Sequence, residues 1–355
     1  MATSSTTSVA PLSRAVVTAV QRTSQQFILL FLPLLAGAQP RVSGLLQPDA
    51  PKLLEWRADH HMHLASADLC RLVGECLASN NPPAVFASDA VHALDEARVA
   101  RGVILSCAYL YGLPSLRLTS NDIAAKTRLE NEFAAAEVAK FPTRLVGFLS
   151  VNPLQTSAID EIRHWSGSRV LVGLKLHFPA SAVHMRNPAE RRHVERVFKA
   201  AAEQHLPIVI HIGGDDFDDS DAEVFIRTVL PSAGSSWVQI AHAGGGYPPD
   251  KRARVLRRFA DYIAQDDPLT RHVLFDLAYV PAPEDDAAAV ISLMREVRRI
   301  GIERFLFGSD FNVLTPSQEI AYLARLGLTT DEMNSLRRKC APWVCQASTA
   351  ERLAN

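Results

Sequence analysis

The sequence has almost no net charge. Its 355 residues contain 37 Lys and Arg against 38 Asp and Glu, which gives a formal net charge of −1. A chain without a basic excess is not expected to bind nucleic acid or an anionic membrane surface through its overall charge. The composition therefore favours an enzyme that acts on a small molecule, and it is compatible with a homo-oligomer.

Cysteine is also scarce. The five cysteines are an odd number, and their spacing matches no zinc-binding pattern. They are Cys70, Cys76, Cys107, Cys340 and Cys345. In an exported protein Cys340 could pair with Cys345, or Cys70 with Cys76. Without such pairing, the five cysteines are expected to be small buried side chains.

The apolar run near the N-terminus, Phe27 to Leu35, is too short to span a membrane comfortably. It has the length of a signal-peptide core, and the cleavage pattern Ala36-Gly37-Ala38 follows it. We predict that residues 1–44 form a signal or targeting segment, and that the mature chain has no membrane span. The protein would then be periplasmic or secreted. The alternatives are an organelle transit segment, or a cytoplasmic chain with a misplaced start codon.

Internal repeats and low-complexity linkers are absent after residue 50, where short apolar runs alternate with helical patterns instead. Such alternation is typical of a parallel sheet with crossover helices. The predicted strands are Leu53–His63, Gly102–Cys107, Leu145–Val151, Val170–His177, Pro207–His211, Trp237–His242, Val273–Leu277 and Arg304–Asp310. We expect an α/β fold of the (β/α)8 TIM-barrel type, formed as a single domain by residues 45–350, with helices at its C-terminus. A doubly wound open sheet is the alternative.

Polar residues at the carboxyl ends of the predicted strands favour the barrel. They are His61, His63, Lys175, His177, His211, His242 and Asp310. A barrel places its active site at these strand ends and brings its first and last strands together. An open sheet would leave those two strands apart.

The run Asp59-His60-His61-Met62-His63 ends the first predicted strand. Because alternate side chains of a strand point the same way, Asp59, His61 and His63 are expected on one face, with His60 and Met62 on the other. Two imidazoles at this spacing can bind one metal ion. Asp59 could accept the second ring N–H of a ligating histidine. By itself, the pair is also compatible with two hydrogen-bonded core histidines.

Five motifs contain the polar residues. They are Asp59-x-His61-x-His63, Gly173-Leu174-Lys175-Leu176-His177, Pro207-Ile208-Val209-Ile210-His211, Ala241-His242-Ala243-Gly244-Gly245-Gly246-Tyr247-Pro248 and Phe307-Gly308-Ser309-Asp310-Phe311. In combination they resemble the amidohydrolase superfamily, and in particular the amidohydrolase-related branch that includes the aminocarboxymuconate-semialdehyde decarboxylase type. The resemblance extends from about residue 55 to residue 345.

The resemblance implies one divalent metal, expected to be zinc, with His61, His63, His211 and Asp310 as ligands. Asp310 would also act as the general base that takes a proton from water. His242 would orient that water or polarise a substrate carbonyl. The alternative is that these residues are structural polar groups in the mouth of the barrel.

Lys175 and His177 have less certain roles. In two-metal members of the superfamily a carboxylated lysine at the position of Lys175 bridges the ions, and His242 would bind the second one. Otherwise Lys175 would form a salt bridge with Asp59 or Asp276, which are both expected around the ligands. His177 would contact the substrate or order a loop.

The resemblance leaves three functions open. The first is a metal-dependent hydrolase of an amide, ester or lactone. The second is a non-oxidative decarboxylase of an aromatic or muconate-type acid, which would use the same metal site. The third is a binding protein that has kept the site without catalysis. The complete pair His61 and His63 favours hydrolysis, and intact Asp310 and His242 argue against the third function.

Overall fold

The computed structural model describes residues 56–76, 83–214, 216–245, 249–280 and 286–345. The predicted signal or targeting segment, residues 1–44, lies outside the described residues. So do the side chain of Cys76 and residues 246–248 of the glycine-rich motif. Within the described residues, no helix combines the length and the apolar character needed to cross a membrane.

Eight parallel strands form one sheet, and each strand pairs with the next one along the chain. The strands are β1 (Asp59–Leu64), β2 (Gly102–Ser106), β3 (Leu145–Ser150), β4 (Leu171–His177), β5 (Ile208–His211), β6 (Val238–Ile240), β7 (Val273–Asp276) and β8 (Phe305–Leu306). Every strand residue except Val172 and His211 is buried, because apolar side chains pack on both faces of the sheet.

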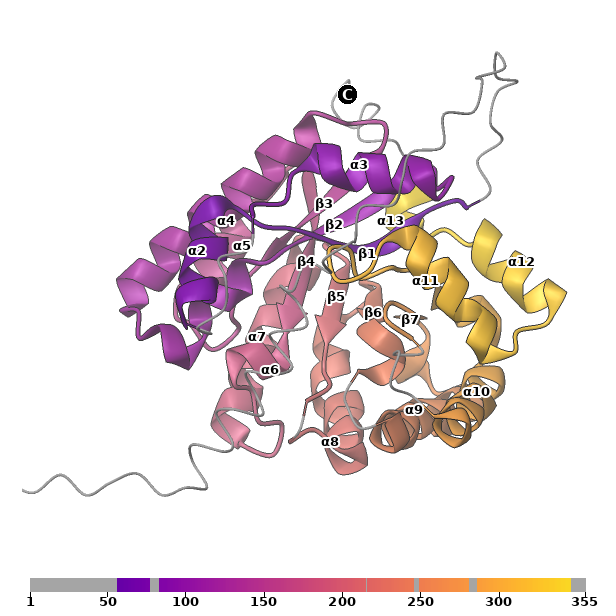
Figure 1. Cartoon of the computed structure of the whole chain (residues 1–355). Helices are drawn as coiled ribbons and strands as arrows, with labels where there is room; N and C mark the ends of the chain where they lie inside the picture. The colour runs from indigo at the N-terminus through magenta and orange to yellow at the C-terminus, as the bar shows by residue number, and fades with distance from the viewer. Residues whose placement is uncertain (1–55, 77–82, 215, 246–248, 281–285, 346–355) are drawn as a thin grey trace, which may run out of the picture.

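Helices follow the strands and lie around the sheet (Figure 1). They are α2 (Ala67–Cys76), α3 (Ala87–Glu96), α4 (Ser120–Ala139), α5 (Ala158–His164), α6 (Phe178–Ser181), α7 (Pro188–Glu203), α8 (Asp219–Val224), α9 (Pro249–Ala264), α10 (Ala287–Ile300), α11 (Pro316–Leu323), α12 (Thr330–Arg338) and α13 (Pro342–Cys345). No helix was predicted from the sequence at the position of α2. Ser66 Oγ accepts a hydrogen bond from the Leu69 backbone N–H and so caps its first turn.

The two edges of the sheet meet. The backbone N–H of His60 donates to Phe307 O at 2.9 Å, and that of Asp310 donates to His61 O at 2.8 Å. The curled parallel sheet with helices around it is a TIM-barrel-like α/β fold, as predicted. Because the strands follow one another in chain order and the first lies beside the last, the doubly wound alternative is excluded.

Two predicted strands are shorter than the sequence suggested. β6 ends at Ile240 and β8 at Leu306, so His242 and Asp310 lie in turns beyond the strands. Both have a positive φ, 55° for His242 and 61° for Asp310. The backbone N–H of His242 donates to Asp276 on β7, and that of Asp310 donates to His61 O on β1, so both turns are tied to neighbouring strands.

The C-terminal segment packs against the sheet through Ala341, Trp343 and Val344, which join an apolar cluster with strand residues such as Phe148. The Arg101 guanidinium, just before β2, donates to Val344 O at 2.7 Å. This contact places α13 at the end of the sheet where the strands begin. A disulfide between Cys340 and Cys345 closes the segment, and Cys70 and Cys107 are buried free thiols.

Reducing this disulfide is expected to lower the free energy of unfolding by about 2 kcal/mol, because it frees only a short loop in the unfolded chain. For a domain of this size the thermal midpoint should fall by about 3 °C. Thermal unfolding with and without dithiothreitol measures the shift. A Cys340→Ser/Cys345→Ser double variant should start at the lower midpoint and no longer respond to dithiothreitol. An unchanged midpoint in the wild type after complete reduction would contradict the expectation.

Candidate metal centre

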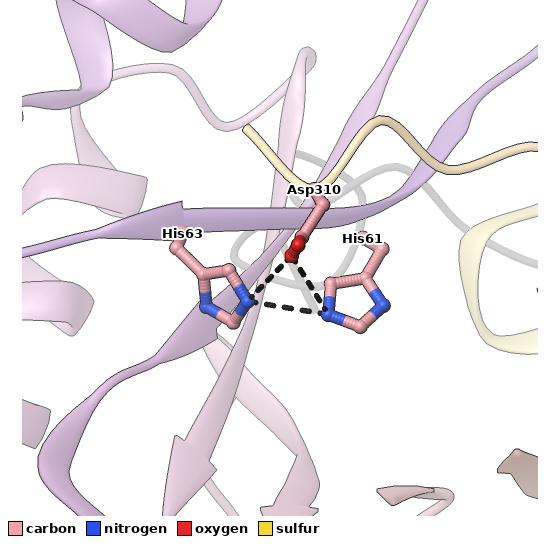
Figure 2. A group of neighbouring side chains, drawn as sticks. All are labelled: His61, His63 and Asp310. Carbon is pink, nitrogen blue, oxygen red and sulfur yellow. Dashed lines mark hydrogen bonds and ion pairs between the residues drawn. The ribbon is translucent and has the colours of Figure 1, made fainter. Parts of the chain in front are cut away.

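Three donor atoms converge where the carboxyl end of β1 meets the turn after β8 (Figure 2). His61 Nε2 and His63 Nε2 lie 3.2 Å apart. Asp310 Oδ1 is 3.5 Å from His61 Nε2 and 3.3 Å from His63 Nε2. All three side chains are buried. The structure therefore brings together three of the four predicted metal ligands.

The protons on the two imidazoles point away from this cluster. His63 Nδ1 is 3.0 Å from Leu105 O, a carbonyl that can only accept, so Nδ1 carries the proton. His61 Nδ1 donates in the same way to Asp276 Oδ2 at 3.0 Å. In their neutral forms both rings thus present a lone pair on Nε2 to the cluster.

Asp310 Oδ1 is buried and, with both imidazoles neutral, has no hydrogen-bond donor among the described residues. Two nitrogen lone pairs and a carboxylate oxygen at this separation repel one another unless a positive charge lies among them. Two imidazoles and a carboxylate, with each Nδ1–H held by an acceptor, are a donor set that suits a divalent cation. The residues present therefore fit the metal that the sequence implies.

The charges of the cluster agree with this assignment. Burial, followed by the nearby Lys175, lowers the pKa of His61 well below its ordinary value, so this imidazole stays neutral. Burial opposes ionisation of Asp310, but the surrounding side chains, first among them His63 through its hydrogen bond, outweigh it and lower the pKa of this carboxyl. Burial also opposes a charge on His63, but Cys107 and Asp310 raise its pKa to about 10. In the metal-free protein a proton on His63 thus supplies positive charge, and a cation would displace it.

His211, the fourth predicted ligand, belongs to neither group of donor atoms that lie within 4.8 Å of one another. Its ring centroid is 4.6 Å from that of His242 and 4.2 Å from that of His177. His242 in turn lies 4.7 Å from His61. His211 is therefore placed at the same strand ends, but one ring further from the cluster, and its role as a ligand stays a prediction.

His242 is held in its left-handed turn by two hydrogen bonds. Its backbone N–H donates to Asp276 Oδ1 at 2.8 Å, and its Nδ1 donates to Ala278 O at 2.8 Å. Burial lowers the pKa of His242, so the ring is neutral and Nε2 carries a lone pair. The donor atoms of His242, His61 and Asp276 form the second group that could hold a cation. The turn thus places a second neutral imidazole beside His61.

Asp59 has a different role from the predicted one. Its Oδ1 accepts the backbone N–H groups of His61 and Ser309, both at 3.0 Å, and the ring N–H of His61 goes to Asp276 instead. The reason is a register shift in β1 between Asp59 and Met62, which breaks the alternation that the sequence implied. Asp59 therefore ties the backbone of β1 to the turn that carries Asp310.

His60 is held by two hydrogen bonds. Its Nδ1 lies 2.9 Å from Phe307 O, and its Nε2 accepts the Ala341 backbone N–H at 3.1 Å. Met62 packs in the large apolar core cluster, whereas His60 makes polar contacts with β8 and the C-terminal segment. His60 connects β1 to β8 and to the C-terminal segment, away from the three donor atoms.

Lys175 is fully buried, and its Nζ lies 3.3 Å from His61 Nε2. Burial lowers the pKa of Lys175 to about 8, although Asp276 and Asp310 oppose the shift, so the ammonium form still predominates at neutral pH. Within the described residues it forms no salt bridge with Asp59 or Asp276, the alternative considered from the sequence. Lys175 therefore adds a positive charge at the edge of the cluster.

His177 Nδ1 accepts the backbone N–H of Ala180 at 3.1 Å and so caps α6. Its ring stacks on Tyr109, with centroids 4.8 Å apart and planes inclined by 17°. These contacts agree with the loop-ordering role considered from the sequence. They also extend a row of rings from Tyr109 through His177 and His211 to His242.

Two residues beside the cluster were missed from the sequence. Gln239 Nε2 lies 2.6 Å from Asp276 Oδ2, and Cys107 Sγ lies 3.4 Å from His63 Nδ1. Gln239 carried a signal that could have been used, since it is a polar residue in an otherwise apolar strand three positions before His242. Cys107 carried none, because a lone cysteine after a buried strand is usually a packing residue.

The parallel sheet curls so that its first and last strands meet, and donor atoms gather at its carboxyl ends. These are features of an enzyme with a TIM-barrel-like fold and a metal centre. The family model described as amidohydrolase matches residues 58–341, and the chain therefore belongs to the amidohydrolase family. No protein with a curated description matches it in sequence.

Solved structures share the fold at low sequence identity. The 2,6-dihydroxybenzoate decarboxylase from Rhizobium is 11% identical, with a TM-score of 0.57 over 80% of this chain and 96% of that one. The 5-carboxyvanillate decarboxylase from Novosphingobium aromaticivorans, complexed with manganese and a nitrobenzoic acid, is 11% identical, with a TM-score of 0.55 over 82% and 96%. A probable 2-pyrone-4,6-dicarboxylic acid hydrolase from Acinetobacter baumannii is 14% identical, with a TM-score of 0.51 over 79% and 96%.

Proposed function

We propose that this protein is a divalent-metal-dependent, non-oxidative decarboxylase of a small aromatic or muconate-type acid. The observation that carries the proposal is the buried Lys175 ammonium, 3.3 Å from the metal-facing nitrogen of His61. A cation in the cluster and this ammonium would place two positive charges side by side in a buried site. Asp276 and Asp310 offset part of this charge. The remaining positive charge favours an anionic substrate, because a buried charge without a partner is costly. A neutral amide or ester needs no second positive charge.

The rings beside the cluster support a planar substrate. Tyr109, His177, His211 and His242 form a row in which neighbouring centroids lie 4.2–4.8 Å apart. Flat faces of this kind stack on aromatic or conjugated molecules. Among the similar structures are two decarboxylases of aromatic acids, one of which is complexed with manganese. The row of rings and the similar decarboxylases favour decarboxylation, whereas the sequence alone had favoured hydrolysis. They do not favour zinc over manganese as the metal.

Each residue has a defined part in this reaction. When bound, the metal supplies positive charge that orients the substrate oxygens and stabilises negative charge. Lys175 binds the substrate carboxylate or an adjacent oxygen. When the bond to the carboxylate carbon breaks and CO₂ leaves, the electron pair stays on the substrate carbon, which must then gain a proton. We assign that transfer to Asp310, which would take the proton from water and deliver it to the carbon, and we assign the orientation of the substrate to His242.

A panel of hydroxybenzoic and muconic acids, incubated with manganese-loaded protein in D₂O, tests the proposal. At least one acid should release CO₂ and take up deuterium at the carbon that lost it. Lys175→Met should bind manganese as the wild type does, yet release much less CO₂, because the carboxylate loses its partner. Product that carries ¹⁸O from labelled water, formed from esters or lactones without CO₂, would show a hydrolase instead.

Hydrolysis of an ester, lactone or amide is the second candidate. The complete pair of His61 and His63 favours hydrolysis, because the two rings could hold the metal while Asp310 acts as the base that takes a proton from water. One of the three similar structures is a probable hydrolase. His242 would then polarise the carbonyl that the water attacks.

We also propose that the chain is exported, and that the segment before residue 45 directs this export. The disulfide between Cys340 and Cys345 supports the proposal, because disulfides persist mainly in oxidising compartments.

A further inference from the structure

Gln239 in β6 is a fully buried amide that joins two strands of the metal centre. Its Nε2 lies 2.6 Å from Asp276 Oδ2 on β7 and 3.3 Å from the backbone oxygen of His60 on β1. A carboxylate and a carbonyl only accept hydrogen bonds, so the amide must present its NH₂ group to both. The orientation of this side chain is therefore fixed by its two partners.

The Asp276 oxygen that Gln239 contacts is the one that accepts Nδ1–H of His61 at 3.0 Å. Oδ1 of the same carboxylate accepts the backbone N–H groups of His242 and Ala278. The carboxylate is thus held on both oxygens, and among the described residues only Gln239 and His61 donate to it from side chains. Because Gln239 and His61 donate to the same oxygen, Asp276 Oδ2, Gln239 limits the rotation of the carboxylate. It also reduces the negative charge on this oxygen that acts on His61. The proton accordingly stays on Nδ1, and the lone pair on Nε2 faces the cluster.

Stability alone does not favour a glutamine at this position. Its Oε1 is buried and has no hydrogen-bond partner among the described residues. A buried acceptor left unpaired costs free energy that an apolar side chain of similar shape would not cost. Asn131, another fully buried amide, differs in this respect. Its Nδ2 donates to Ser150 O and Glu161 Oε1, and its Oδ1 accepts the Ser150 N–H.

We propose that Gln239 is a positioning residue for the metal centre, which holds Asp276 so that His61 presents Nε2 to the cation. The proposal rests on the metal centre of the proposed function, but not on whether the reaction is decarboxylation or hydrolysis.

Co²⁺ is the probe, because its visible absorption reports the geometry of its ligands. Gln239→Met keeps the length of the side chain and removes both donors, and Asn131→Leu is the matched control. Gln239→Met should weaken Co²⁺ binding about 10–100-fold, measured by competition with a chelator, and should change the cobalt spectrum. The thermal midpoint of metal-free Gln239→Met should fall less than that of Asn131→Leu, because two buried acceptors lose a donor but the unpaired Oε1 is removed as well. Asn131→Leu should lower the midpoint further and leave the cobalt affinity and spectrum unchanged.

Two results would overturn the proposal. One is Gln239→Met with wild-type Co²⁺ affinity and spectrum. The other is a midpoint that falls as far as that of Asn131→Leu, with weaker binding but an unchanged spectrum, which would show a purely structural role. A wild type that binds Co²⁺ tightly but releases no CO₂ would refute the decarboxylase and leave Gln239 in its role. A wild type that binds no Co²⁺ would refute the metal centre and this proposal together.

Discussion

Asp310→Asn is expected to lower turnover by about 10²–10⁴-fold, the usual contribution of general acid–base catalysis. Asp310 lies 3.3 Å from His63 and 3.5 Å from His61, and its carboxyl is the group there that can both face a cation and transfer a proton. The amide of asparagine still offers an oxygen to the metal, but it can neither take a proton from water nor deliver one to carbon. Much of the bound metal should therefore remain while turnover is lost, and elemental analysis beside a rate measurement separates the two effects.

Asp59→Asn is the matched control for this substitution. Asp59 is equally buried and close by, but its Oδ1 contacts backbone N–H groups, which an amide oxygen can also accept. Burial raises the pKa of Asp59 to about 7, so replacing this carboxyl by a neutral amide changes the charge of the site less than the same change at Asp310. Asp59→Asn should lose far less turnover than Asp310→Asn. Equal losses in the two variants would indicate a shared structural effect and remove the assignment of Asp310 as the proton-transferring group.

The sequence predicted the order of the strands and the end of the sheet at which the polar residues gather. Both follow from local patterns, because apolar runs of strand length alternate with helical stretches, and the histidines come where the runs stop. The convergence of His61, His63 and Asp310 followed from the same rule. These predictions needed no knowledge of contacts between distant residues.

The parts that the sequence could not predict depend on such contacts. β1 has a register shift between Asp59 and Met62, so its side chains do not simply alternate between the two faces of the sheet. His60 there forms a hydrogen bond with Phe307 O, 247 positions away. The turns at His242 and Asp310 are likewise fixed by hydrogen bonds to other strands rather than by their own residues. Gln239 matters only because β7 places Asp276 beside it. No local pattern contains that information.

His61→Ala is expected to lower the bound metal by more than about tenfold, from about one ion per chain in the wild type. Its Nε2 is the most connected donor atom of the site. It lies 3.2 Å from His63 Nε2, 3.5 Å from Asp310 Oδ1 and 3.3 Å from Lys175 Nζ, and His61 belongs to both groups that could hold a cation. Without this ring, two donors remain in the cluster, and turnover should fall with the metal content.

The neighbouring His60 provides the control, because it is equally buried but points its ring at Phe307 O and the Ala341 N–H. His60→Gln can still donate and accept, so it should fold, with a lower thermal midpoint and close to the wild-type metal content. Elemental analysis after gel filtration, together with thermal unfolding of both variants, distinguishes ligand loss from loss of structure. If His61→Ala kept its metal, or if His60→Gln lost as much metal as His61→Ala, the histidines of β1 would be structural groups. The cation would then have to lie elsewhere at the strand ends, because His61 also belongs to the other group of donors, with His242 and Asp276.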